Sequence, residues 1–452
     1  ALAGSEGMTA LQQLGSYVAN GRSPSASLLA KAKLHVIDGV AAWIAGIGTA
    51  EGQALLAFRR ESEAGMPAAL AAHCALARLS EIDDIHLAAM TTAGGIVVPG
   101  ALTMAASLKI DDSAVLGSAI IAGYEAMIRL GLALHGPTIL YRGIWPSYFG
   151  AGFGIAAAAS RLMRLDERQA AHALAFALTQ SSPGVGHHNA PTTTRWLAVG
   201  LAAHNGLIAA QAARAGFTSD LNLLDGRFLA SVYDIKVDTA ELTRGLDQHS
   251  VLTEVSFKPW CAARQTFAAT LALKEILARG VAPEEIVEIE AGVLPPHHAM
   301  LDHGVTPGDR ASHLTSLPYQ MALAALMPEA MYDVRQSPAE IPAAVAALMA
   351  KVKVRQNELL LAHYPRVWPA HVRVATATGV VHECEVEHVP GDGRLPFDQA
   401  QIDDKFRRFA TPVLGGEGAA RMLALASAAL DNAQAAPRLV RAIEEACARS
   451  PH

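Results

Sequence analysis

The chain has 452 residues, so two domains are expected, because a single hydrophobic core rarely grows to this size. Hydrophobic residues make up 51% of the chain, charged residues 17% and aromatic residues 5%, a composition typical of closely packed helices with small side chains at their contacts. The net charge of −6 and the scattered Lys and Arg residues exclude a basic surface for nucleic acid or an anionic membrane, so we expect a small ligand.

So small a charged fraction leaves much of the surface apolar, and a subunit interface is the simplest way to cover it. We therefore expect a homodimer or a larger assembly. Cys74, Cys261, Cys384 and Cys447 lie far apart without metal-ligand spacing, which favours reduced thiols in a cytoplasmic protein over disulfides or zinc. We also expect no signal peptide.

The first half of the chain alternates Ala- and Leu-rich runs with Gly, Pro or Asn. Residues 23–47 predict a helix capped by Ser23 with Pro24 at its first position, and residues 166–184 predict a helix that Asp166 opens. The longest uncharged run, residues 87–108, has three glycines, a proline and four hydroxyl residues, which favours two buried helices over a membrane span. These patterns predict an all-α domain and no membrane partner.

Residues 81–95, EIDDIHLAAMTTAGG, place three acids and a histidine ahead of a Gly-rich run. Asp83 and His86 would be neighbours on a helix, where a carboxylate can orient an imidazole for proton transfer. Thr91, Thr92 and the glycines after them would let the backbone approach a ligand. The alternative is a helix cap with a solvated acidic turn.

Residues 141–154, YRGIWPSYFGAGFG, concentrate aromatic side chains in a chain that has few of them. Arg142, Trp145 and Tyr148 could form one wall of a pocket. Core packing between glycine-spaced helices explains the same pattern equally well.

Residues 184–200, GVGHHNAPTTTRWLAVG, begin as a loop and become a helix near Pro191 that carries Arg195 in its first turns. His187, His188 and Asn189 could line a polar pocket. A histidine pair in a loop is more often a surface feature than a ligand, so this segment alone is a weak signal.

Residues 257–266, FKPWCAARQT, gather a lysine, an arginine, a thiol and an indole. Pro259 suits the first position of a helix, which would place Cys261, Arg264 and Gln265 on one face. Arg264 is fit to hold a carboxylate through two N–H groups, and Lys258 would be a second clamp or, if desolvated, a base. The alternative is an interdomain salt bridge beside buried apolar side chains.

After this segment the pattern changes. Residues 283–294 alternate like a strand, and residues 371–392 predict a hairpin turned at Thr378-Gly379, with helices between them and after residue 396. The expected fold is mainly α, with a large all-α domain, residues 1–256 and 395–452, and an inserted smaller α+β lid domain, residues 257–394. The FKPWCAARQT segment then lies at the seam between the domains, where ligand sites are common.

Several known sites have no motif in this chain. No GxGxxG opens a βαβ unit, and no GxSxG, P-loop or HExxH occurs. Nucleotide-binding, hydrolase-triad and zinc-protease functions therefore lack support.

Five motifs in this order resemble the MmgE/PrpD family, which includes 2-methylcitrate dehydratase, cis-aconitate decarboxylase and iminodisuccinate epimerase. They are EIDDIH with the later VVP, WPS before GAGFGIAAAASRLM, the N-x-x-x-x-T-R helix start, FKPWCAARQT and SLPYQMALAAL. The likeness spans nearly the whole length. It implies an all-α domain with an α+β lid, a site between them, no metal or organic cofactor, and a small di- or tricarboxylate substrate.

The chain departs from the family pattern at three histidines. Thr91-Thr92-Ala93 and Ile144-Trp145 stand where the dehydratase and decarboxylase members carry a histidine, and a third is missing near Gln265. Arg195 corresponds to the lysine of the family's T-K-P helix start. The resemblance therefore fits the lyases less well than an epimerase, which only removes and returns one α-proton.

We accordingly expect an epimerase or racemase of a small dicarboxylate such as iminodisuccinate. Asp84, His86, Tyr148, His188 and Lys258 are the candidate acids and bases. The candidate substrate-binding residues are Thr91, Thr92, Trp145, Asn189, Arg195, Arg264 and Gln265. The alternatives are a cofactor-free hydro-lyase of the 2-methylcitrate dehydratase type and an inactive homologue that binds carboxylates.

Overall fold

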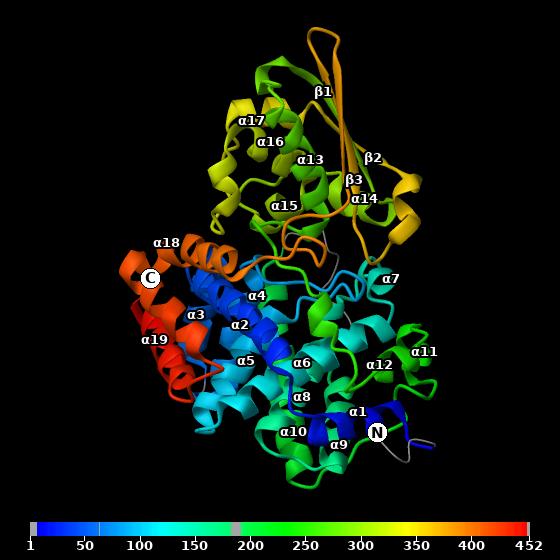
Figure 1. Ribbon diagram of the computed structural model, residues 1–452, viewed down its shortest axis with the longest axis vertical. Helices are drawn as coiled ribbons and strands as arrows, with labels where there is room; N and C mark the ends of the chain where they lie inside the picture. The colour runs from blue at the N-terminus through cyan, green and yellow to red at the C-terminus, as the bar shows by residue number, and fades with distance from the viewer. Residues whose placement is uncertain (1–6, 63, 182–189, 191, 450–452) are drawn as a thin grey trace. The chain divides into compact units, whose positions relative to one another are not determined.

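The computed structural model describes residues 7–62, 64–181, 190 and 192–449. The chain forms two compact units (Figure 1). Unit 1 comprises Ala1–Gly186, Thr193–Val255 and Asp398–His452, and unit 2 comprises His187–Thr192 and Ser256–Phe397. Helices predominate, and the four strands within the described ranges form one sheet, so the mainly α class is confirmed.

The described part of unit 1 consists of helices and the loops between them, with one isolated β-bridge between His86 and Thr91. Its helices are α1 (Ala10–Asn20), α2 (Ala26–Ile47), α3 (Ala50–Glu61), α4 (Met66–Leu79), α5 (Gly94–Ser107), α6 (Ser113–Ala133), α7 (Gly136–Leu140), α8 (Pro146–Leu162), α9 (Glu167–Thr179), α10 (Thr194–Arg214), α11 (Phe228–Tyr233), α12 (Thr239–Thr243), the 3₁₀ turn η1 (Val251–Glu254), α18 (Gln399–Ala428) and α19 (Ala435–Arg449).

Small residues set the packing at the centre of unit 1, where α8 packs against both α6 and α10. A Cβ added at Gly206 of α10 would lie 2.2 Å from the carbonyl oxygen of Gly152 on α8, so these two helices cross at backbone contact. Helix α6 is long and apolar enough to cross a membrane, but 83% of its apolar window is buried inside the unit, as in the central helix of a bundle.

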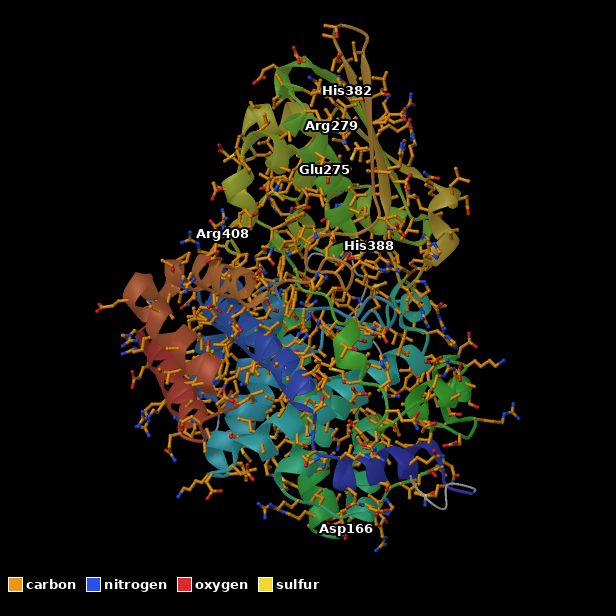
Figure 2. All side chains as sticks on the ribbon, in the orientation of Figure 1. Asp166, Glu275, Arg279, His382, His388 and Arg408 are labelled. Atoms are coloured by element: carbon orange, nitrogen blue, oxygen red, sulfur yellow. The ribbon has the colours of Figure 1, made fainter. Side chains whose placement is uncertain are left out.

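The helix starts follow capping chemistry, with one correction. Ser25, not Ser23, caps α2, and its hydroxyl accepts a hydrogen bond from the Leu28 N–H at 3.2 Å. Asp166 caps α9 as predicted (Figure 2). The uncharged run 87–108 forms one helix, α5, after a turn, because Met90 adopts a left-handed φ of 53° and no helix forms before Ala93.

Segments from opposite ends of the sequence meet within unit 1. Helix α18 packs along α2. Between them Lys405 Nζ lies 2.5 Å from Asp38 Oδ1 and also donates to the Ile82 carbonyl at 2.7 Å. Lys405 and Asp38 are only 6% and 1% exposed, so this is a buried ion pair that ties the C-terminal helices to the first half of the unit.

Unit 2 contains the mixed four-stranded sheet, in the order β2-β1-β3-β4. Strands β1 (Ile286–Val293) and β2 (Val352–Gln356) are parallel, while β1 with β3 (Ala370–Thr376) and β3 with β4 (Val381–Val386) are antiparallel. The predicted hairpin between β3 and β4 is confirmed. The other elements are η2 (Arg264–Thr266), α13 (Phe267–Ala278), η3 (Pro283–Glu285), α14 (Pro295–Leu301), α15 (Arg310–Thr315), α16 (Leu317–Leu326), η4 (Pro328–Tyr332), α17 (Ala343–Met349) and η5 (Glu358–His363).

The sheet buries one face and exposes the other. Helices α13 and α16 contribute with the strands to one apolar core. On α13, Arg279 donates to the Glu383 carbonyl of β4 at 3.0 Å, and the Cys384 thiol donates to Glu275 at 3.2 Å (Figure 2 labels Glu275 and Arg279). On the opposite face Arg373 pairs with Glu383 at 2.8 Å across the hairpin. Buried and exposed side chains thus alternate along β3 and β4, as expected of antiparallel strands with one face in solvent.

Candidate active site

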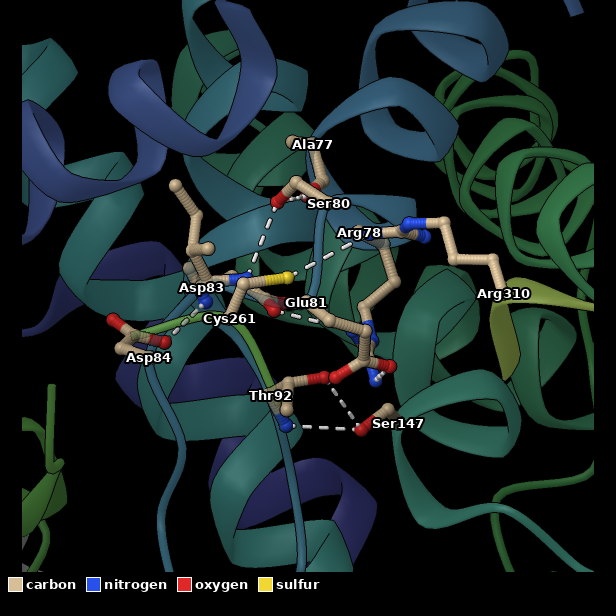
Figure 3. Close-up of polar contacts among 12 residues, drawn as sticks. Ala77, Arg78, Ser80, Glu81, Asp83, Asp84, Thr92, Ser147, Cys261 and Arg310 are labelled. Carbon is tan, nitrogen blue, oxygen red and sulfur yellow. Dashed lines mark hydrogen bonds and ion pairs between the residues drawn. The ribbon is translucent and has the colours of Figure 1, made fainter. Parts of the chain in front are cut away.

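The acidic segment after α4 is a turn rather than a helix, so the predicted pairing of Asp83 with His86 is wrong. Arg78 at the end of α4 holds this turn instead (Figure 3): its Nη2 donates to Glu81 at 2.8 Å and its Nη1 donates to Asp83 at 3.1 Å. Glu81 has a left-handed φ of 60°, the fold-back that brings its carboxylate to the same guanidinium. All three groups are buried.

Asp84 is fully buried and accepts three hydrogen bonds. Its donors are His35 Nδ1 of α2 at 2.7 Å, Tyr124 Oη of α6 at 2.6 Å and the Gly94 N–H at the start of α5 at 2.8 Å. Glycine is required at position 94, because a Cβ there would lie 2.6 Å from Asp84 Oδ2. Burial raises the pKa of Asp84, but the bonds from His35, Tyr124 and Gly94 outweigh burial and leave that pKa below its ordinary value.

His86 is also buried, and both of its ring nitrogens face protein groups. Nδ1 accepts from the Ala89 N–H at 3.1 Å, and Nε2 lies 3.6 Å from Glu254 Oε2. Glu254 is half-exposed and also meets His249 Nε2 at 2.8 Å. The two imidazoles lower the pKa of Glu254 to about 2.

Thr91 and Thr92 follow this turn, and Thr92 meets Ser147 at the start of α8 (Figure 3). The Thr92 N–H donates to Ser147 Oγ at 2.9 Å, and the two hydroxyl oxygens are also 2.9 Å apart. The Thr91 hydroxyl donates to the Ala89 carbonyl at 3.0 Å. Ser147 is the second residue of α8, so this contact ties Thr92 to the first turn of the helix that carries Tyr148.

Tyr148, Trp145 and Arg195 come together in unit 1. The rings of Trp145 and Tyr148 are 5.1 Å apart between centroids, and the Arg195 guanidinium carbon lies 5.2 Å from the Trp145 ring. Within the described ranges, three buried donors here have no hydrogen-bond acceptor, namely Tyr148 Oη, Trp145 Nε1 and Arg78 Nε. Burial raises the pKa of Tyr148, against the opposing effect of the charges on Arg78 and Arg195, so its phenol keeps its proton.

In unit 2, the FKPWCAARQT segment is irregular: residues 259–262 bend, the 3₁₀ turn η2 follows, and no helix starts at Pro259. Helix α13 begins only at Phe267, after a 3₁₀ turn, so Cys261, Arg264 and Gln265 do not share a helical face. Lys258 and Arg264 are buried at 1% and 2% exposure, and Gln265 is half-buried.

Arg264 already has a carboxylate partner in unit 2. Its Nη2 lies 2.7 and 2.8 Å from the two oxygens of Asp392, and its guanidinium carbon lies 5.8 Å from the Trp368 ring. Nε and Nη1 are buried and have no acceptor among the described residues. His297 packs on Trp368 at 4.8 Å, and burial with the nearby Arg264 charge lowers the pKa of His297 to about 3.

The predicted residues His188 and Asn189 lie outside the described residues. The sequence analysis missed Arg78, Ser147, His35, Tyr124 and Asp392. Only Arg78 and Ser147 carried a local signal, because they lie beside motifs already singled out; the others come from distant helices or loops.

Two protein-family models match the chain. The model of the MmgE/PrpD N-terminal domain matches residues 12–243, and the model of the MmgE/PrpD C-terminal domain matches residues 260–432. No curated protein matches it. The chain therefore belongs to the MmgE/PrpD family, whose members are dehydratases, decarboxylases and epimerases.

Proposed function

We propose that the protein epimerises or racemises a small dicarboxylate, such as iminodisuccinate, by moving one α-proton. The observation that carries this proposal is the group of buried donors on Tyr148, Trp145 and Arg78. A buried donor without an acceptor costs about 1–3 kcal/mol, so native proteins rarely leave several together unless a ligand or water accepts from them. A carboxylate supplies two acceptor oxygens with the matching charge.

The cations beside these donors suit the charge that forms during the reaction. Removing the proton next to a carboxylate places negative charge on that group, and the Arg195 guanidinium beside Trp145 would stabilise it. Returning a proton on the opposite face inverts the carbon, and no atom is gained or lost. Tyr148 would give this proton, because its hydroxyl has no other acceptor among the described residues.

The partner base must abstract a proton, and Asp84 is poorly placed for that. Its oxygens already accept from His35, Tyr124 and Gly94, and its low pKa makes it a weak base. The sequence analysis predicts His86, His188 and Lys258 as further acids or bases, and these stay predictions. Thr92 and Trp145 stand where lyase relatives carry histidines. Thr92 bonds Ser147 and Trp145 packs against Tyr148, and neither side chain titrates near neutral pH. Their presence therefore supports an epimerase over a lyase.

Incubation of one enantiomer of the dicarboxylate in deuterated water tests the proposal. An epimerase exchanges one α-hydrogen and loses optical purity without forming an ultraviolet-absorbing alkene. Alkene formation would identify a hydro-lyase instead, and no exchange with intact binding would identify an inactive homologue. Tyr148→Phe should slow this exchange. Its matched control is Tyr319→Phe, in the core of unit 2, because the Tyr319 hydroxyl bonds only Gln336 among the described residues.

A further inference from the structure

His86 lies inside a tight loop that its own side chain closes. The loop is joined at its ends by His86 N–H to Thr91 O at 2.8 Å and Thr91 N–H to His86 O at 3.3 Å. Within it, Ala89 donates its backbone N–H to His86 Nδ1 at 3.1 Å, and Met90 adopts the left-handed φ of 53°. The imidazole therefore serves as the internal acceptor that a loop of this shape needs.

The bond from Ala89 fixes the tautomer of His86. Because Nδ1 accepts a hydrogen, a neutral ring must carry its own hydrogen on Nε2. That nitrogen lies 3.6 Å from Glu254 Oε2, which is within ion-pair range but longer than a hydrogen bond. Nδ1 is thus occupied by the Ala89 N–H, while Nε2 has no hydrogen-bond partner among the described residues and meets the Glu254 carboxylate as an ion pair.

Glu254 is itself held in place. Its other oxygen meets His249 Nε2 at 2.8 Å. The preceding segment, residues 244–250, is bonded to two buried residues of α6. Arg129 donates to the Arg244 carbonyl at 2.7 Å and to the His249 carbonyl at 3.1 Å. The Ser250 hydroxyl donates to Glu125. A fixed carboxylate at Glu254 can therefore orient the ring of His86.

The C-terminal end of the loop leads to α8, whose first residues include Tyr148 of the candidate site. Thr92 follows Thr91 directly and bonds Ser147 through its N–H and its hydroxyl, both at 2.9 Å. Ser147 is flanked in sequence by Pro146 and Tyr148 at the start of α8. A shift of the loop would therefore move Thr92 against Ser147, in the first turn of the helix that carries Tyr148.

We propose that His86 and Glu254 are positioning residues, which hold the loop 86–91 so that Thr92 stays bonded to Ser147 at the start of α8, the helix that carries Tyr148, and that His86 transfers no proton. This assignment rests on the proposed function, since it gives the pair a part in that reaction. It replaces the acid–base role that the sequence alone suggests for His86.

The first test needs no substrate. In protein labelled with ¹⁵N-histidine, His86 should show the Nε2–H tautomer at pH 8, and in protein labelled at the threonine methyls, Glu254→Ala should shift the signals of Thr91 and Thr92. The control is Glu241→Ala, which removes an ion pair with Arg244 at 2.9 Å in the same unit. An Nδ1–H tautomer, or threonine signals that Glu254→Ala leaves in place, would overturn the proposal.

The second test uses α-hydrogen exchange of the dicarboxylate. An asparagine at position 86 keeps an oxygen that can accept from Ala89, whereas leucine keeps none. His86→Asn should therefore restore most of the rate that His86→Leu loses and stay within about fivefold of the wild type, the equivalent of one hydrogen bond, with an unchanged pH profile. A proton-transfer group would instead lose about 100-fold or more in His86→Asn, together with one limb of the profile, and that result would refute positioning.

The two tests keep the two proposals apart. If wild-type protein exchanges no dicarboxylate, the proposed function fails, yet the tautomer and the threonine signals still decide whether the pair positions the loop. If exchange occurs and the threonine signals ignore Glu254, only the positioning role fails.

Discussion

Replacing Lys405 with methionine should destabilise unit 1 more than any surface change of the same kind. The substitution keeps the unbranched side chain but removes the charge that lies 2.5 Å from Asp38 Oδ1. Asp38 is then a buried carboxylate with no cation in contact. It has either to remain charged in an apolar setting or to take up a proton.

The protonation route sets the size of the effect. In wild-type protein, burial raises the pKa of Asp38 and the nearby Lys405 charge opposes that rise. Protonating a carboxyl whose ordinary pKa is 3.8 costs about 4 kcal/mol at pH 7, or 1.36 kcal/mol for each of roughly three pH units. We therefore expect Lys405→Met to lower the free energy of unfolding by about 3–5 kcal/mol, the usual cost of breaking a buried pair.

The same reasoning fixes the pH dependence. Without Lys405, the pKa of Asp38 in the folded protein lies further above its unfolded value, so proton uptake favours the folded state. The deficit should be smallest below pH 3.8 and should grow as the pH rises through the folded-state pKa. Urea unfolding followed by circular dichroism at several pH values between 4 and 8 measures it.

Two companion variants make the measurement decisive. Lys33→Met removes a surface pair with Asp431 at 2.7 Å, also between α2 and the end of α18, and should cost less than about 1 kcal/mol. Asp38→Asn combined with Lys405→Met should recover most of the loss, because no buried charge then remains. A pH-independent deficit, or a double variant as unstable as Lys405→Met, would refute the argument.

Three further outcomes are expected. Tyr148→Phe should lower kcat for proton exchange by about 100-fold or more with a smaller change in KM, measured by deuterium incorporation. Gly94→Ala should lower the free energy of unfolding, measured in urea, by about 1–3 kcal/mol, because its Cβ would press on the Asp84 carboxylate at 2.6 Å. Asp392→Asn should destabilise the protein by about 3 kcal/mol, since it leaves the buried Arg264 guanidinium without its anion; calorimetry that finds an unchanged melting temperature would contradict this.

Elements governed by local chemistry could be predicted from the sequence. Asp166 caps α9 as its position before a helical pattern indicated, and the hairpin of β3 and β4 turns at the predicted Gly379, whose φ is 81°. Helix α16 likewise begins after Ser316, which accepts from the Tyr319 N–H at 3.3 Å. In each case the signal and the structure lie within a few residues of each other.

Elements held by distant partners could not be predicted. The residues after Pro259 do not form an α-helix because their N–H groups bond elsewhere: Cys261 to the Met331 carbonyl at 3.0 Å and Ala263 to the Leu314 carbonyl at 2.9 Å. Those bonds replace the ones a helix would have supplied. Strand β2 was missed for a similar reason, since it follows the helical pattern of α17 directly and becomes a strand by parallel pairing with β1.

The candidate site shows the same limit in its chemistry. The sequence identified Asp84 as a group able to take a proton, but not that His35, Tyr124 and Gly94 would converge on it from α2, α6 and α5. A proton placed on Asp84 would remove the negative charge that strengthens these three hydrogen bonds, which is why they lower its pKa. Tyr148 has no such bond to lose, because its hydroxyl has no acceptor among the described residues. Of these two acidic groups, the one without a hydrogen-bond partner is therefore the better placed to exchange a proton with a substrate.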